Sequence, residues 1–101
     1  MKSEMNELQQ KPEIYINGVA AYFDQLVPVA TDDQLFASGY LRGHFDLAVG
    51  SLEVTGDDFE KNDILQQVEQ SLQQAIDNGE LTPDDQQIVG ELWQHIQRIP
   101  A

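Results

Sequence analysis

The sequence has no cysteine among its 101 residues and only five lysines and arginines. The absence of cysteine excludes disulfides and thiolate metal sites, and it fits a reducing compartment. The scarcity of cations disfavours nucleic-acid binding, which requires a basic surface. No apolar run approaches the ~20 residues that a membrane span needs, and the first residues lack the apolar segment of a signal peptide. We therefore expect a cytoplasmic protein that contacts neither nucleic acid nor membrane.

Acidic residues, in contrast, are abundant and spread along the whole chain. Eighteen aspartates and glutamates give a formal net charge of -13. Such a surface keeps a small protein soluble and monomeric, and it also suits a basic protein partner. The length of the chain supports one domain with one core.

Helical periodicity dominates the sequence after a polar start. Residues 1–11 show no sustained period and predict a disordered N-terminal arm, followed by a single helical domain over residues 12–101. Apolar stripes at helical spacing predict four helices, which cover about residues 12–27, 31–53, 62–78 and 83–99. No run alternates with period two long enough for a strand. The predicted fold is all-α, a compact bundle of about four helices.

Local signals predict where these helices begin and end. Thr31 and Gln34 can form a capping box at the start of the second helix. Thr82 and Pro83 suit the start of the fourth helix, and Gly79 suits the end of the third.

The second predicted helix carries three glycines, each of which costs about 1 kcal/mol relative to alanine in a helix interior. At 100° per residue they fall within about 40° of one another, on one line with Asp46. They are Gly39, Gly43 and Gly50. We favour the interpretation that a neighbouring helix, or a large side chain such as Tyr22 or Trp93, packs against the bare backbone. In the alternative interpretation the glycine groove receives a partner helix or a ligand.

The remaining residues of this helix leave only a narrow polar strip, formed by Ser38, Arg42 and Glu53. A helix that is apolar almost all round is a central one. We therefore predict that the second helix lies in the middle of the bundle.

Candidate catalytic groups do not converge in the sequence. His44 could bind a metal or move a proton, but Asp46 points to a different helix face. Positions four residues away hold Tyr40 and Ala48 instead of a ligand. No nucleophile elbow, phosphate-binding loop or zinc-protease motif is present. We expect a protein that is not an enzyme, with no catalytic residue, no metal and no cofactor.

Two segments carry a resemblance to a known family. They are DDQLFASGYLRGH at residues 32–44 and GELTP at residues 79–83, the latter leading to Trp93. In these segments the chain resembles the YfcL family of small bacterial proteins, for which no biochemical function is established. The resemblance covers the chain from about residue 12 onward. It implies a small, helical, cytoplasmic bacterial protein and supplies no catalytic residue.

Two functional hypotheses follow from these observations. The first is a non-enzymatic protein–protein interaction module that binds a basic partner or a second copy of itself, as a monomer or weak homo-oligomer. The alternative is a small-molecule or metal-binding protein, or an enzyme, that uses the glycine groove with Arg42, His44 and Asp46 and has a concave pocket there. Aromatic residues dominate interface hot spots, so Tyr40 and Trp93 are candidate anchors, although core packing is the expected role of both. The candidate partner-binding residues are Gly39, Tyr40, Arg42, Gly43, His44, Asp46 and Trp93.

Overall fold

The computed structural model describes the backbone of residues 2–101 and the side chains from Pro12 onward. Its elements are α1 (Lys2–Leu26), the short 3-10 helix η1 (Val27–Val29), α2 (Asp32–Thr55), α3 (Lys61–Asp77) and α4 (Pro83–Gln97). No strand occurs within residues 2–101, which confirms the predicted all-α bundle. The predicted disordered arm falls on residues 1–11, outside the part of the chain whose side chains are described, and it stays a prediction.

Helix ends follow the local signals in the sequence. Thr31 accepts a hydrogen bond from the backbone N–H of Gln34 at 3.2 Å, and the Gln34 side chain accepts one from the N–H of Thr31 at 3.0 Å. This is the predicted capping box of α2. Thr82 caps the first turn of α4 through its side-chain oxygen. Gly56 and Gly79 follow the ends of α2 and α3 with φ of 77° and 74°, a conformation that glycine adopts without steric cost.

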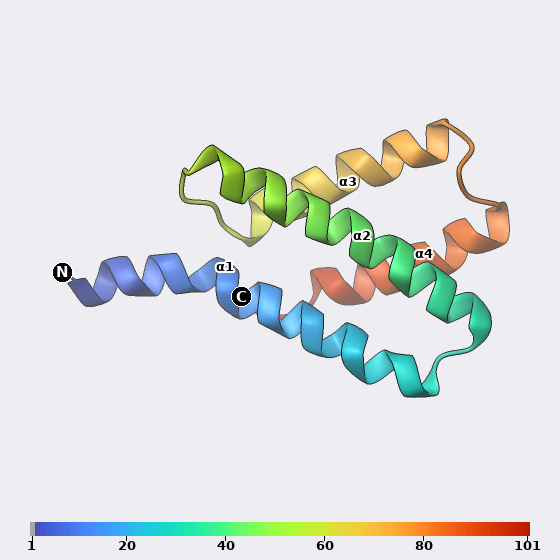
Figure 1. Cartoon of the computed structure of the whole chain (residues 1–101), viewed down its shortest axis with the longest axis horizontal. Coiled ribbons are helices and arrows are strands. Elements are labelled where there is room, and N and C mark those ends of the chain that lie inside the picture. The colour runs from blue at the N-terminus through green and yellow to red at the C-terminus, as the bar shows by residue number, and fades with distance from the viewer. Residues whose placement is uncertain (1) are drawn as a thin grey trace.

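The second helix is not enclosed in the middle of the bundle as predicted, because one of its sides, which carries Leu47 and Val54, is exposed. It packs against both α3 and α4, and in Figure 1 it crosses in front of both. Apolar side chains from all four helices complete the core around it. The core residues outside α2 are Tyr15, Val19, Phe23, Ile64, Val68, Leu72, Leu81, Val89, Leu92, Trp93 and Ile96.

Contacts with the end of α4 hold α1 in place. Tyr15 is fully buried, its hydroxyl donates to the carbonyl oxygen of Ile96 at 2.8 Å, and its ring centroid lies 5.8 Å from that of Phe45. The Lys61 ammonium donates to the carbonyl oxygen of Ile99 at 2.7 Å and lies 4.9 Å from the centroid of the Tyr15 ring. Residues far apart in the sequence thus close the core together. In the described part of the chain, no helix is both long and apolar enough to traverse a lipid bilayer.

Candidate interaction surface

The inner face of α2 is narrower than the sequence indicates. It consists of Ala37, Ser38, Leu41, Phe45, Ala48 and Val49. Ser38, which we assigned to the polar strip, is only 6% exposed. Burial is tolerated because its hydroxyl donates to the carbonyl oxygen of Leu35 at 3.1 Å, which satisfies the polar group within the helix.

The three glycines of α2 face away from this core. With Leu41 set at 0° and 100° per residue, Gly39, Gly43 and Gly50 fall at about 160° to 200°, on the opposite side of the helix. A Cβ atom added at any of these glycines would meet nothing within 4 Å beyond its own helix. The favoured interpretation, that another part of the chain packs against this backbone, is therefore wrong.

The two side chains proposed to fill the groove are engaged elsewhere. Tyr22 stacks on His95 of α4 with ring centroids 4.5 Å apart. Trp93 is 6% exposed, belongs to the core, and donates its indole N–H to a carboxylate oxygen of Glu69 at 2.7 Å. Trp93 is thus not available as an anchor on this surface.

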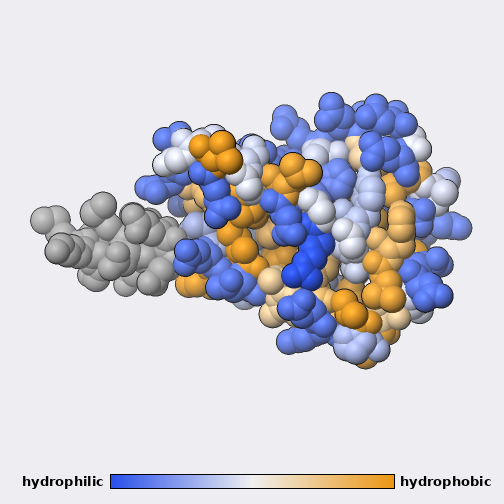
Figure 2. All heavy atoms as spheres, viewed as in Figure 1, coloured by the Kyte–Doolittle hydropathy of each residue, from blue (hydrophilic) through white to orange (hydrophobic). Residues whose placement is uncertain are grey.

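Large apolar side chains flank the exposed glycines. Phe36 is 53% exposed, Leu47 73% and Val54 87%. We call the resulting surface the outer seam, defined as Phe36, Tyr40, Gly43, Leu47, Gly50 and Val54. These residues alternate steps of four and three, the spacing with which a helix presents one face to a partner helix. Figure 2 shows hydrophobic residues at the surface along the path of α2, with hydrophilic ones between them.

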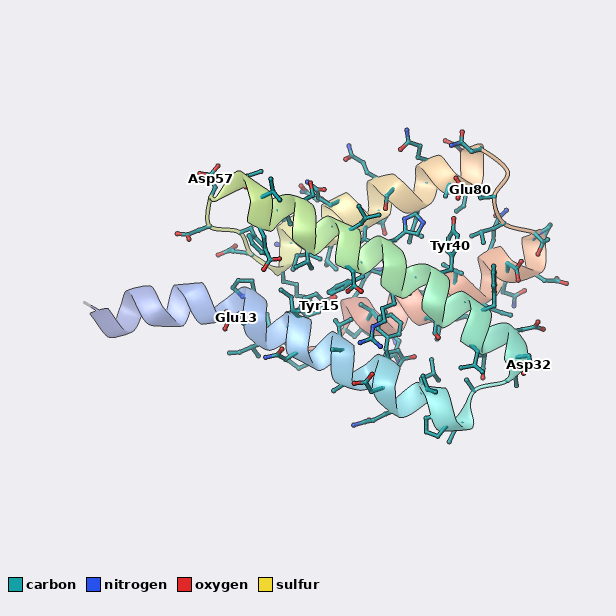
Figure 3. All side chains as sticks on the ribbon, in the orientation of Figure 1. Glu13, Tyr15, Asp32, Tyr40, Asp57 and Glu80 are labelled. Carbon is teal, nitrogen blue, oxygen red and sulfur yellow. The ribbon has the colours of Figure 1, made fainter. Side chains whose placement is uncertain are left out.

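Acidic residues border the outer seam. Asp46 and Glu53 precede Leu47 and Val54 directly and are both exposed, so they lie along one side of the seam. Asp32 is the first residue of α2, and Asp57 lies two residues beyond its last (Figure 3). The surface beside the apolar line is therefore negatively charged on one flank and at both ends.

Arg42, His44 and Asp46 form no common site, because His44 lies on a different face of α2 from the other two. Arg42 turns to α1, where it pairs with Asp24 at 3.2 Å and lies 5.5 Å from the centroid of the Phe23 ring. Asp46 is exposed. Among the described residues, no group of three or more acidic or histidine side chains is arranged to hold a metal ion.

His44 faces α3 instead of the glycines. Its Nδ1 lies 2.8 Å from the hydroxyl oxygen of Ser71, and its ring centroid is 4.8 Å from that of Tyr40. The Tyr40 hydroxyl donates to a carboxylate oxygen of Glu80 at 2.9 Å, and Figure 3 shows the two side chains pointing toward each other. Burial, together with the Glu80 hydrogen bond and charge, raises the pKa of Tyr40 to about 12.

A cleft of about 310 Å³ opens between α2 and α3 beside His44 and Ser71. Leu47 and Ser51 line both this cleft and the shallow groove over Gly43 and Gly50. A concave pocket of the kind that the alternative hypothesis requires is thus present, but it lies next to the glycine groove and lacks Arg42 and Asp46.

The close approach that we expected at α2 occurs at Gly18 of α1. A Cβ atom there would lie 2.9 Å from the Cγ2 atom of Ile99. The sequence holds a signal for this contact, because Gly18 lies three residues after Tyr15 and four before Tyr22, on the apolar side of α1. Ser71 and Glu80 were also missed, since their contacts with α2 bridge 27 and 40 residues of chain.

A family model described as YfcL protein matches residues 13–98. The chain belongs to the YfcL family. A YfcL relative from Escherichia coli (strain K12), named "Uncharacterized protein YfcL", is 47% identical over 78 residues, which are 77% of this chain and 84% of the relative. No solved structure matches this YfcL chain. The name of the relative assigns no activity to it.

Proposed function

We propose that this protein is a non-enzymatic interaction module, and that the outer seam of α2 binds a helix of a partner protein. The exposed glycines carry the proposal. Gly39, Gly43 and Gly50, of which the last two belong to the seam, together cost about 3 kcal/mol of helix stability relative to alanine. No contact from the described residues offsets this cost, because the space above each glycine is open. A partner helix that approaches the bare backbone would recover dispersion energy there.

The outer seam has the form of a helix-docking surface. It extends from residue 36 to residue 54, about 28 Å at 1.5 Å per residue, which is five turns of helix. Phe36, Leu47 and Val54 expose apolar area that a partner would remove from water. Gly43 and Gly50 leave holes between them that large side chains of the partner can fill.

Charge favours a basic partner over a second copy of the chain. Asp46 and Glu53 occupy the positions directly before Leu47 and Val54, where helix pairs place the charged side chains that set partner choice. The whole chain carries a formal net charge of -13. Its described side chains form one ion pair, that of Arg42 with Asp24. Two copies would therefore repel each other. We propose a basic amphipathic helix as the occupant, met in the cytoplasm.

Site-specific photo-crosslinking tests this proposal. A photoreactive residue replaces Leu47 in the seam, and the control carries it at Gln87, an exposed position on α4. We expect crosslinks from position 47 to a segment with apolar residues at helical spacing and lysines or arginines beside them. The same adduct from position 87 would contradict the proposal, as would an acidic or non-helical segment at position 47.

A variant in which the outer seam is blocked provides a second test of the proposal. Gly43→Leu should abolish the crosslink from position 47, because the added side chain fills a hole meant for the partner. The melting temperature should not fall, since nothing within the chain lies near Gly43. A Gly43→Leu variant that folds normally and still forms the crosslink would overturn the assignment of the seam.

A further inference from the structure

The cleft between α2 and α3 has a chemistry of its own that the proposed function does not use. It is about 310 Å³ in volume, at the lower end of the range for small-ligand sites. It adjoins the outer seam, because Leu47 and Ser51 belong to the linings of both. A side chain that leaves a helix docked on the seam would therefore reach it.

His44 and Ser71 meet at the base of the cleft, where Nδ1 of His44 lies 2.8 Å from the hydroxyl oxygen of Ser71. The Ser71 oxygen also lies 3.1 Å from the carbonyl oxygen of Val68, so its single proton has two candidate acceptors. In the tautomer in which Nδ1 donates to Ser71, the lone pair of the neutral imidazole lies on Nε2, and His44 can accept a hydrogen bond from a ligand.

Other acceptors surround the cleft. Glu80 lines it and engages one carboxylate oxygen with the Tyr40 hydroxyl, so that its charge stays at the rim. Gln67, Gln74 and Asn78 add amide oxygens to the lining. Among the described side chains no lysine or arginine lines the cleft, so a cation with several N–H donors fits its acceptors.

Small apolar side chains form the remaining walls. Ala48 and Ala75 lie opposite each other on α2 and α3, with Leu47 beside them. Such walls suit the methylene stem of a long cationic side chain whose charged head reaches polar groups. A guanidinium group has five N–H donors in a planar fork on such a stem, whereas an ammonium is a compact point charge.

We infer that the cleft between α2 and α3 binds a guanidinium group. Its source is an arginine side chain of the helix on the seam, in which case the inference rests on the proposed function, or a free guanidino compound. Glu80 and His44 hold the guanidinium head, and the alanine walls hold its stem.

Titration with small probes, followed by NMR of the full chain, tests the inference. The probe is N-acetyl-L-arginine amide, and its neutral isostere N-acetyl-L-citrulline amide is the control. We expect saturable shifts at His44, Ser71 and Glu80 with the arginine probe. Citrulline should bind at least about tenfold more weakly, because a charge-assisted hydrogen bond contributes about 1.5 to 3 kcal/mol. No saturable shift with arginine, or equal shifts with both probes, would overturn the inference.

Two matched variants separate the cleft from the seam. Glu80→Gln should weaken binding of the arginine probe several-fold. Asp77→Asn removes the same charge outside the cleft and should not weaken it. Gly43→Leu should leave probe binding unchanged although it blocks the seam. If Glu80→Gln and Asp77→Asn weaken binding of the arginine probe equally, the effect comes from net charge alone. That result would overturn the assignment of the cleft as the binding site.

The source of the guanidinium follows from combining both assays. If Glu80→Gln also weakens the crosslink from position 47 to an arginine-containing segment, the partner helix supplies the group. If the probe binds and that crosslink is unchanged, the cleft binds a free guanidino compound. Probe binding without any specific crosslink at the seam would support the cleft and refute the proposed function alone.

Discussion

Leu41 and Leu47 are both leucines of α2, but their surroundings differ completely. Leu41 is 0% exposed in the core, whereas Leu47 is 73% exposed on the outer seam. The glycines show a parallel contrast, since Gly18 faces Ile99 at close range and Gly43 faces open space. Apolar and small residues therefore mark two different surfaces on this chain. One is filled by the chain itself, and the other is open for a partner.

The largest expected effect is the difference in the free energy of unfolding between alanine variants of the two leucines. Leu41→Ala should lower the free energy of unfolding by about 2 to 5 kcal/mol, because it leaves a cavity in the core. Leu47→Ala should change it by no more than about 0.5 kcal/mol, as is usual for an exposed position. Urea denaturation of both variants measures the difference. Similar losses for the two would show that the outer seam is packed in solution.

The same substitution at two glycines sharpens the contrast. Gly18→Leu should lower the free energy of unfolding by about 1 to 3 kcal/mol, because the new side chain displaces Ile99. Gly43→Leu, with no neighbour to displace, should not be destabilising. Adding Ile99→Ala should offset part of the Gly18→Leu loss, and thermal unfolding of the single and double variants tests this coupling. If the two substitutions add without coupling, the close approach at Gly18 is not the cause.

Alanine at the exposed glycines should have a smaller effect of the opposite sign. Each of Gly39→Ala and Gly43→Ala should raise the free energy of unfolding by up to about 1 kcal/mol, through better helix propensity. Binding of the partner should weaken at the same time if the backbones approach closely. A loss of stability on denaturation would mean that these positions have an internal contact after all.

The last prediction concerns Tyr40, which lies at the boundary between the two surfaces. Its pKa is raised by burial and by Glu80 to about 12, from 10.0. The unfolded chain therefore loses this proton at lower pH, so the Tyr40 contribution to stability is complete below about pH 10 and declines between about pH 10 and 12. Across that range the wild type should lose more stability than Tyr40→Phe, measured by urea midpoints. Equal losses would mean that the pKa of Tyr40 is not raised by folding.

Local signals predicted the helices because capping is short-range. The hydroxyl of Thr31 needs only the N–H of Gln34, and the left-handed turn at Gly79 needs only a residue without a side chain. Such contacts lie within a few residues of chain. The family resemblance in residues 32–44 was read from the sequence for the same reason, since it needs only consecutive letters.

The orientation of α2 could not be predicted because periodicity shows which residues share a face but not which face is buried. Apolar residues occupy both sides of this helix, so Leu41 and Leu47 look alike in the sequence. Packing by α3 and α4 decides between them. The meeting of His44 with Ser71 depends on the same packing, because only the final crossing of α2 and α3 brings the two side chains together.

The bond from Tyr15 to Ile96 joins residues separated by 81 positions. Synthesis must therefore pass residue 96 before the Tyr15 hydroxyl has its acceptor. Until then α1 lacks its contacts with Ile96 and Ile99, although its partners on α2, such as Phe45, are already made. Shortening the chain by the few residues around Ile96 and Ile99 would thus affect the nascent protein at its opposite end.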